Sequence, residues 1–274
     1  MPHVIRACLA FAAALVAASA AVAATSPWAE TTGARLRLVA PGGRPAADGT
    51  LTAGIEIALE DGWKTYWRHP GDAGIAPEFD FSASTNLAGA AVRFPAPHRF
   101  EDGGATSAGY EGTVVLPVAL TPAVAALPVM VAVTVHFGLC RELCVPATAT
   151  ARVMVSAATV PDAAAAALVA EAEAAVPGGP GEAGLAVTAV AADPAAAGAV
   201  VVTARLAEPD APADLFAEGP GDAFPPLPAF LGRDGATARW RVVLDRNRPA
   251  PAGALIRLTL VNGAAAVEEE RPLP

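Results

Sequence analysis

Two cysteines, Cys140 and Cys144, lie close together in the segment FGLCRELCVPA (137–147). Such a pair supports three kinds of chemistry: a structural disulfide, a redox couple that exchanges its disulfide with other thiols, or a soft site for a metal such as copper(I). If a strand continued through the segment, the two Cα atoms would be about 13 Å apart, whereas a disulfide needs roughly 4.4 to 6.8 Å. We therefore expect a turn between the cysteines if they pair.

The value of this pair as a structural disulfide is small. The bond would close a very short loop and stabilise the fold by about 2 kcal/mol, against about 4.7 kcal/mol for a 100-residue loop. A chain of this length can bury a core that does not depend on such a bond. A disulfide on a turn is, however, accessible to an attacking thiolate, and strain makes it easier to reduce. Redox exchange is therefore favoured, with a local structural disulfide kept as an alternative.

A metal site ranks third among these interpretations. His136, Cys140 and Cys144 follow one another at four-residue steps, with Met130 upstream, and these soft ligands suit copper(I). They would share a face on a helix, but the β-branched run before Cys140 argues against helix. Zinc would need a fourth ligand that the sequence does not offer nearby. We assign no metal and give His136 no role.

The N-terminus determines which redox compartment the cysteines meet. One basic residue, Arg6, is followed by an apolar stretch and then by small residues. This pattern predicts a secretory signal peptide over residues 1–24, cleaved after Ala23 or Ala24. Cys8 would be removed with it, which leaves an even pair of cysteines in a compartment where disulfides persist. We expect a periplasmic protein.

Composition excludes some classes of partner. The chain of 274 residues has 18 basic and 27 acidic residues and a net charge of -9, so nucleic acid is not an expected partner. The apolar segment 122–139 contains prolines, Thr134 and His136, and its valines alternate as in a strand. We interpret it as a core strand, so the mature chain is not expected to span a membrane.

Short β patterns, punctuated by Pro, Gly and Asp, dominate the first half and are typical of a sandwich. Strands are expected over 34–40, 51–60, 89–95, 113–120, 128–137 and 149–157. A helix is expected within 160–176, where Pro161 and Asp162 suit a helix start, and PGGPGEAG then forms a linker. Strands are expected again over 185–192, 199–207, 236–245, 254–263 and 265–271. The sequence predicts a sandwich over 25–158, a helix and linker over 159–184, and a second sandwich over 185–274.

Several motifs together resemble a known family. GWKTYWRHPGDAGIAPEFDFSASTNLAGAAVRFPAPHRF, GYEGTVVLPV and CRELCVPA are similar to the periplasmic N-terminal region of the DsbD family of transmembrane thiol-disulfide reductases, in particular to its ScsB branch of copper-sensitivity suppressors. The resemblance covers residues 36–271, including FPPLPAFLGRDGATARWRVVL in the second half. It implies immunoglobulin-like sandwiches.

The resemblance also implies a function. Cys140 and Cys144 match the redox pair that relays electrons from the membrane-embedded part of the family to periplasmic thioredoxin-fold proteins. We therefore expect a component of a thiol-disulfide oxidoreductase system, with no organic cofactor because the two sulfurs store the electrons. The membrane helices and thioredoxin-like domain of full-length relatives are absent from the sequence, so a separate membrane reductase is the expected electron donor, with thioredoxin-fold or copper-handling proteins as acceptors. The alternative is a non-catalytic binding module, with a copper(I) site or a structural disulfide.

The aromatic residues Trp63, Tyr66 and Trp67 allow two interpretations. They can pack in a core near a turn at Pro70–Gly71, or they can form a capping loop over the cysteine pair, as the resemblance implies. Arg68 and Asp72 are expected to form a local ion pair of little energetic value.

Two further segments receive simple interpretations. EDGGATSAGYEG (101–112) is expected to be a loop, and the acidic run 268–270 is expected on a solvated strand edge.

Overall fold

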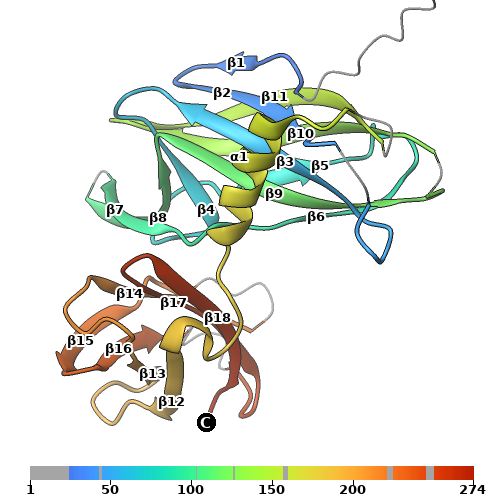
Figure 1. Cartoon of the computed structure of the whole chain (residues 1–274). Coiled ribbons are helices and arrows are strands. Elements are labelled where there is room, and N and C mark those ends of the chain that lie inside the picture. Colours follow the sequence, from blue (N-terminus) through green and yellow to red (C-terminus); the bar gives the residue numbers. More distant parts are fainter. Residues whose placement is uncertain are drawn as a thin grey trace, which may run out of the picture.

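The computed structural model describes residues 25–42, 45–102, 104–125, 127–156, 160–220, 225–244 and 250–274. The predicted signal peptide, residues 1–24, lies outside the described residues. Antiparallel strands dominate the described part and form two sandwiches, joined by one helix and a short linker (Figure 1). The prediction of an all-β chain with two sandwiches joined in this way is confirmed. The predicted boundaries between domains stay a prediction.

The first sandwich contains two facing sheets. One has the strand order β1-β2-β3-β9-β6, and the other has the order β11-β10-β4-β8-β7, with β5 paired to β10. The strands are β1 (Ala29–Thr31), β2 (Ala34–Val39), β3 (Leu51–Leu59), β4 (Lys64–Gly71), β5 (Glu78–Asp80), β6 (Leu87–Val92), β7 (His98–Asp102), β8 (Ala105–Glu111), β9 (Thr113–Pro122), β10 (Val129–Cys140) and β11 (Cys144–Val155).

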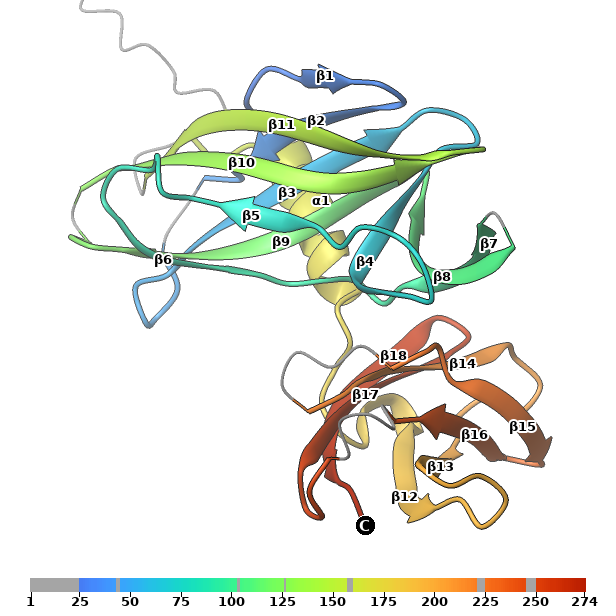
Figure 2. The same cartoon turned by 180° about the vertical axis from the view of Figure 1, so that it is seen from behind.

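The longest pairing in this sandwich is the hairpin of β10 and β11, whose strands run side by side across it (Figure 2). The register runs from the pair Val129 and Val155 to the pair Cys140 and Cys144. Alternate valines of β10 are fully buried in the core, while His136 points outward and is exposed. The period-2 pattern of the sequence therefore fixes which face of the hairpin is buried.

The helix α1 (Ala163–Ala174) packs on the outer face of the β1-β2-β3-β9-β6 sheet (Figure 1). The Asp162 side chain caps its start by accepting hydrogen bonds from the N–H groups of Ala164 and Ala165, both at 2.9 Å. Gly54 in β3 makes the contact possible, because a Cβ there would lie 3.2 Å from a methyl of Val169 and 2.9 Å from one of Val115.

The second sandwich follows the linker and has a separate core around the buried Trp240. Its two sheets have the strand orders β12-β13-β16-β15 and β14-β17-β18. The short 3-10 helix η1 (Glu182–Gly184) precedes the strands β12 (Ala186–Ala192), β13 (Ala199–Arg205), β14 (Ala213–Glu218), β15 (Ala229–Asp234), β16 (Thr237–Val243), β17 (Leu255–Asn262) and β18 (Ala265–Pro272).

One face of β14 connects the second sandwich to the first. Arg99 donates to both carboxylate oxygens of Asp214, at 2.8 and 2.9 Å, and Trp67 packs edge-on against Phe216 at 5.6 Å between ring centroids. These partners lie at alternate positions of β14, so they project from the same face.

Arg68 makes the remaining charged contacts of this junction. It donates to both oxygens of Glu218, the next residue on that face of β14, at 2.7 to 3.2 Å, and it also contacts Glu268 of β18. The local pair expected between Arg68 and Asp72 is wrong. The Arg68 guanidinium reaches across the junction, and the Asp72 carboxylate accepts instead from the Leu227 N–H at 3.3 Å.

Two simple interpretations of the sequence are also corrected. The segment 101–112, expected to be a loop, supplies parts of β7 and β8, which form a hairpin. Within the acidic run 268–270, Glu269 is buried rather than solvated. Its carboxylate accepts from the Val187 N–H at 2.7 Å and pairs with Arg271 at 2.7 Å. Val187 lies on strand β12, and Arg271 follows the acidic run on β18.

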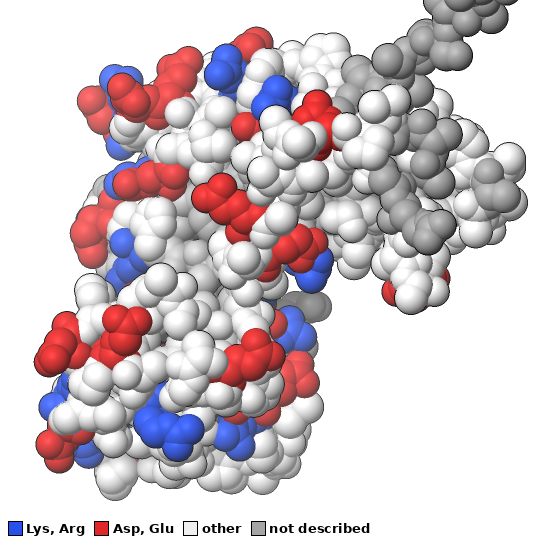
Figure 3. All heavy atoms as spheres, in the orientation of Figure 1, with Lys and Arg blue, Asp and Glu red and all other residues white. Residues whose placement is uncertain are grey.

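Charge is mixed on the face shown in Figure 3, where acidic side chains spread over both sandwiches and basic side chains lie among them. No continuous basic surface is visible on this face, which agrees with the acidic composition. In the described ranges, no helix is both long and apolar enough to cross a membrane.

Candidate functional site

The two cysteines close the β10–β11 hairpin. Cys140 is the last residue of β10, Cys144 is the first residue of β11, and the two are directly opposite each other, with residues 141–143 as the turn. Directly opposite residues in antiparallel strands have Cα atoms about 4.5 to 5.5 Å apart, which falls within the roughly 4.4 to 6.8 Å that a disulfide needs. The hairpin therefore supplies the turn that a disulfide requires without further movement of the backbone.

The two sulfur-bearing side chains differ in exposure. Cys140 is 1% exposed, whereas Cys144 is exposed at the surface. An incoming thiolate can therefore approach the sulfur of Cys144 directly, while Cys140 is shielded by its neighbours. Exposure therefore distinguishes the two cysteines.

Strand β4 provides the shield. It pairs with the end of β10, where Lys64 is opposite Cys140, and the Thr65 hydroxyl donates to the Gly138 carbonyl at 2.9 Å. The buried ring of Tyr66 packs with Phe100 and Cys140, and its hydroxyl lies 3.0 Å from the Cys144 sulfur. Tyr66 thus contacts both cysteines.

Gly138 leaves space for the tyrosine ring. A Cβ at this position would lie 2.7 Å from Tyr66 and 2.9 Å from the Cβ of Ile75. Ile75 is 40% exposed, and its carbonyl accepts the Gly138 N–H at 3.3 Å. The surface beside the cysteines is therefore partly apolar, with the edge of Ile75 next to the ring of Tyr66.

The only lysine of the chain, Lys64, lies on the same side of the sheet as the buried cysteine. Its ammonium donates to the Glu101 carbonyl at 3.2 Å, pairs with Glu111 at 3.6 Å and lies 4.8 Å from the centre of the Phe100 ring. These contacts hold the lysine against the ring that packs on Cys140. This contact of Lys64 could not be predicted from the sequence, because β4 and β10 are far apart along the chain.

The three aromatic residues, interpreted either as core packing or as a capping loop, have different positions. Tyr66 and Trp67 lie in strand β4 and are both buried. Trp67 is completely buried in the core of the first sandwich and points away from Tyr66. Trp63 precedes the strand, and the Arg141 guanidinium of the cysteine turn lies 6.0 Å from the centre of its ring. Tyr66 and Trp63 therefore contact the cysteine hairpin, and Trp67 does not.

Of the residues considered for copper(I), the structure brings together the two cysteines but not His136 or Met130. His136 lies on the outward face of β10 and is hydrogen-bonded to Thr148 at 2.9 Å. At the rise of a strand, the Cα atom of His136 is roughly 13 Å from that of Cys140. The Cα atom of Met130 is roughly 33 Å from that of Cys140. Within the described residues, no group of three or more His, Cys, Asp and Glu side chains could hold a metal ion.

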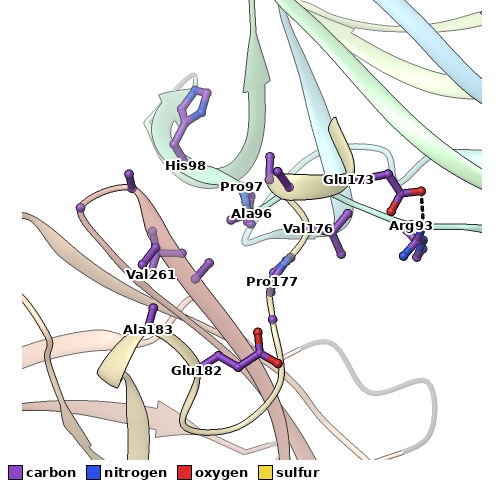
Figure 4. Close-up of a pocket in the computed structure, with 17 residues that line it drawn as sticks. Arg93, Ala96, Pro97, His98, Glu173, Val176, Pro177, Glu182, Ala183 and Val261 are labelled. Atoms are coloured by element: carbon purple, nitrogen blue, oxygen red, sulfur yellow. Dashed lines mark ion pairs between the residues drawn. The ribbon is translucent and has the colours of Figure 1, made fainter. Parts of the chain in front are cut away.

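A recess lies at the junction of the two sandwiches, where α1 ends and the linker begins (Figure 4). It has a volume of about 740 Å³ and is lined mainly by small residues, with the Arg93–Glu173 ion pair and His98 at its sides. It contains none of the predicted site residues. The cysteine hairpin remains the candidate site.

Comparisons with known proteins show what this part of the chain is similar to. Residues 37–155, which contain the cysteine hairpin, match the family described as thiol:disulfide interchange protein DsbD, N-terminal. The match supports a DsbD-like N-terminal domain over these residues. No curated protein matches the sequence at a significant level.

Solved structures extend the comparison beyond the DsbD-type domain. The N-terminal periplasmic domain of ScsB from Proteus mirabilis superposes with a TM-score of 0.72 at 20% identity, covering 91% of this chain and 98% of that one. This similarity includes both sandwiches and confirms the immunoglobulin-like fold class. The reduced DsbD N-terminal domain of Neisseria meningitidis gives a TM-score of 0.25 at 16% identity over 43% of this chain and 82% of that one, which is too poor to inform the fold.

Proposed function

We propose that the chain is a periplasmic thiol-disulfide exchange protein. Cys140 and Cys144 would relay electrons between a membrane-embedded reductase and periplasmic thioredoxin-fold or copper-handling proteins. The observation that carries the proposal is the pairing of one buried and one exposed cysteine at the end of a hairpin. The match of residues 37–155 to the DsbD N-terminal family supports it.

Reduction of the pair begins at the exposed sulfur. A thiolate of the electron donor attacks Cys144, the Cys140–Cys144 bond breaks, and Cys140 leaves with the bonding electron pair and takes up a proton. A second thiolate of the donor then attacks its own half of the mixed disulfide and releases Cys144 as a thiolate. The donor dithiol becomes a disulfide, and the chain gains two electrons.

Delivery of these electrons is the reverse sequence on another partner. The Cys144 thiolate attacks the disulfide of the acceptor and displaces one of its sulfurs, which forms a mixed disulfide. Cys140 then loses its proton and attacks Cys144, which re-forms the internal bond and releases the reduced acceptor. The direct opposition of the two cysteines permits this step without rearrangement of the strands.

Tyr66 is the positioning residue in this scheme. Its hydroxyl, 3.0 Å from the Cys144 sulfur, can donate a hydrogen bond to the thiolate form, and such bonds to charged groups are stronger than neutral ones. Its ring covers Cys140 and restricts solvent access to that sulfur. Both effects favour reaction at Cys144.

The proposed location follows from two sources. The predicted signal peptide over residues 1–24 would export the chain, and the superposed ScsB structure is described as a periplasmic domain. Export would place the cysteines where a disulfide persists and where exchange proteins operate.

Single cysteine variants test the proposal. With Cys140→Ser, we expect the remaining Cys144 to form mixed disulfides with a thioredoxin-fold partner and to react readily with a maleimide. With Cys144→Ser, we expect Cys140 to react at least about tenfold more slowly, because its side chain is buried. The measurement is the alkylation rate of the folded variants, with the unfolded proteins as controls for intrinsic thiol reactivity.

Two outcomes would overturn the proposal. Equal alkylation rates for the two variants would remove the division of roles. A wild-type disulfide that resists both dithiothreitol and a reduced thioredoxin would instead support the alternative of a structural disulfide.

A further inference from the structure

The cysteine turn carries an apolar side chain that the fold does not bury. Leu143 directly precedes Cys144 and is 79% exposed, the largest exposed fraction among the large apolar side chains in the described parts of the chain. The other two turn residues, Arg141 and Glu142, are charged and exposed, as is usual for a hairpin turn. A leucine at this point adds nothing to the core. A single exposed leucine is ordinary on a protein surface, but one directly beside an exposed cysteine can have a use there.

The geometry of exchange supplies one. A mixed disulfide holds the Cα atoms of its two cysteines roughly 4.4 to 6.8 Å apart, and Leu143 lies one residue, about 3.8 Å, from Cys144 along the backbone. Any protein bonded to the Cys144 sulfur must therefore bring its own surface against Leu143. A protein joined to Cys144 by a mixed disulfide would therefore cover the side chain of Leu143.

The surroundings of Cys144 favour a partner surface with apolar character. Ile75, 40% exposed, lies against Tyr66 on the same side of the sheet as the cysteines. A pocket of about 320 Å³ lies between the start of β11 and the segment 30–32. Val145, Pro146 and Ala147 line it together with Glu30 and three threonines. A folded protein can cover these features together with Leu143, whereas a small polar thiol cannot.

We infer that Leu143 is a specificity residue that docks into an apolar depression beside the reactive cysteine of a thioredoxin-fold partner. The inference rests on the proposed function and names the class of partner at the same site. It predicts that the chain exchanges faster with protein dithiols than with glutathione, and that the preference depends on this one side chain.

The test compares two reductants on the oxidised protein. Reduced thioredoxin and dithiothreitol are each mixed with wild type, Leu143→Ser, Leu143→Met and Leu127→Ser, and the second-order rate of disulfide reduction is measured. Leu127 is a matched control, because it is 55% exposed and precedes β10 at the end opposite Cys140. Glutathione serves as a second small thiol.

We expect Leu143→Ser to lower the rate with thioredoxin about tenfold, equivalent to about 1.4 kcal/mol, and to leave the rates with dithiothreitol and glutathione unchanged. Leu143→Met, which keeps the apolar volume, should retain most of the thioredoxin rate, and Leu127→Ser should behave as wild type.

The results separate this inference from the proposed function. Equal thioredoxin rates for wild type and Leu143→Ser would overturn the inference and leave the exchange function intact. A parallel loss with dithiothreitol would also overturn it, because the substitution would then act through the disulfide itself. A wild-type disulfide that neither reagent reduces would overturn both.

Discussion

Two hairpins of the same construction end differently in this molecule. In the first sandwich, β10 and β11 pair up to Cys140 and Cys144, and in the second, β17 and β18 pair up to Asn262 and Ala265. Both are long antiparallel pairs joined by a short turn. The residue that begins the returning strand is exposed in the first hairpin, where it is Cys144, and half-buried in the second, where it is Ala265. The residue opposite it is buried in both, Cys140 in the first and Asn262 in the second.

The hydrogen bonds of Asn262 explain this burial. Its amide group donates to the carbonyls of Glu208 and Pro212, at 3.0 and 3.3 Å, and its side-chain oxygen accepts the Glu208 N–H at 2.8 Å. The end of this hairpin is therefore tied to the loop before β14. The end of the β10–β11 hairpin is held instead by Tyr66, whose ring packs on Cys140 and whose hydroxyl lies 3.0 Å from the Cys144 sulfur. The side chain of Cys144 is nevertheless exposed.

The largest effect that we expect comes from removing the side-chain hydrogen bonds of Asn262 at the end of the β17–β18 hairpin. Asn262→Ala removes three part-buried hydrogen bonds, each worth about 1 kcal/mol, so we expect the second sandwich to lose about 3 kcal/mol of unfolding free energy. Urea unfolding followed by tryptophan fluorescence would measure this loss. The alkylation rate of Cys144 should not change, because Cys144 lies in the first sandwich and Asn262 in the second. A change in that rate would show that the two hairpins are coupled.

A smaller effect is expected from a substitution at Tyr66, beside Cys144. Tyr66→Phe keeps the ring that packs on Cys140 but removes the hydroxyl beside Cys144. Since the hydroxyl can donate to the thiolate, we expect alkylation of Cys144 at neutral pH to slow about tenfold in the reduced protein, with little loss of stability. Alkylation kinetics in the Cys140→Ser background would show this. A faster reaction would mean that the tyrosine acts mainly as a barrier to access.

The sequence predicts several features of the β10–β11 hairpin and the start of helix α1. Alternating valines identified the β10 strand, the separation of the cysteines indicated a turn, and Asp162 marked the helix start. These features are local, because a periodicity or a cap is encoded within a few residues. The burial of Cys140 and the exposure of Cys144 were not predictable in this way.

Strand β4 shows why the rest was missed. Its sequence, KTYWRHPG, has no clear alternation and contains Pro70, which weakens a strand prediction. The structure accommodates this proline because the pairing with β8 is irregular between Tyr66 and Gly71. The contact of Tyr66 with Cys144 joins residues 78 positions apart, and nothing in the local pattern encodes it.

Strand β4 is also the physical link between the two hairpins. Tyr66 contacts the cysteine pair, and two residues later Arg68 contacts Glu268 of β18. The next residue, His69, is completely buried at the junction, where its Nε2 lies 2.9 Å from the Pro225 carbonyl. A carbonyl only accepts, so Nε2 carries the proton. This histidine therefore reports on the junction.

Acid should weaken this junction through His69. Burial lowers the pKa of His69 below its ordinary value of 6.5, and it outweighs the opposing effects of the Pro225 carbonyl, Glu218 and Asp72, while Arg68 acts in the same direction as burial. The folded state therefore binds this proton less readily than the unfolded state. The contribution to stability is complete above about pH 6.5 and falls as the pH drops below that value, by at most about 1.4 kcal/mol for each pH unit crossed.

His69→Gln gives the matched comparison, since glutamine can still donate to the Pro225 carbonyl but does not titrate. We expect wild type to lose more unfolding free energy than the variant between pH 7.5 and pH 5.5, and the difference isolates His69 because the other titrating groups are common to both proteins. Equal losses would place the acid sensitivity elsewhere. The alkylation rate of Cys144 should be measured in both proteins over the same pH range. If the ratio of the two alkylation rates stays constant while the stabilities diverge, the junction stabilises the contact between the sandwiches without affecting the reactivity of Cys144.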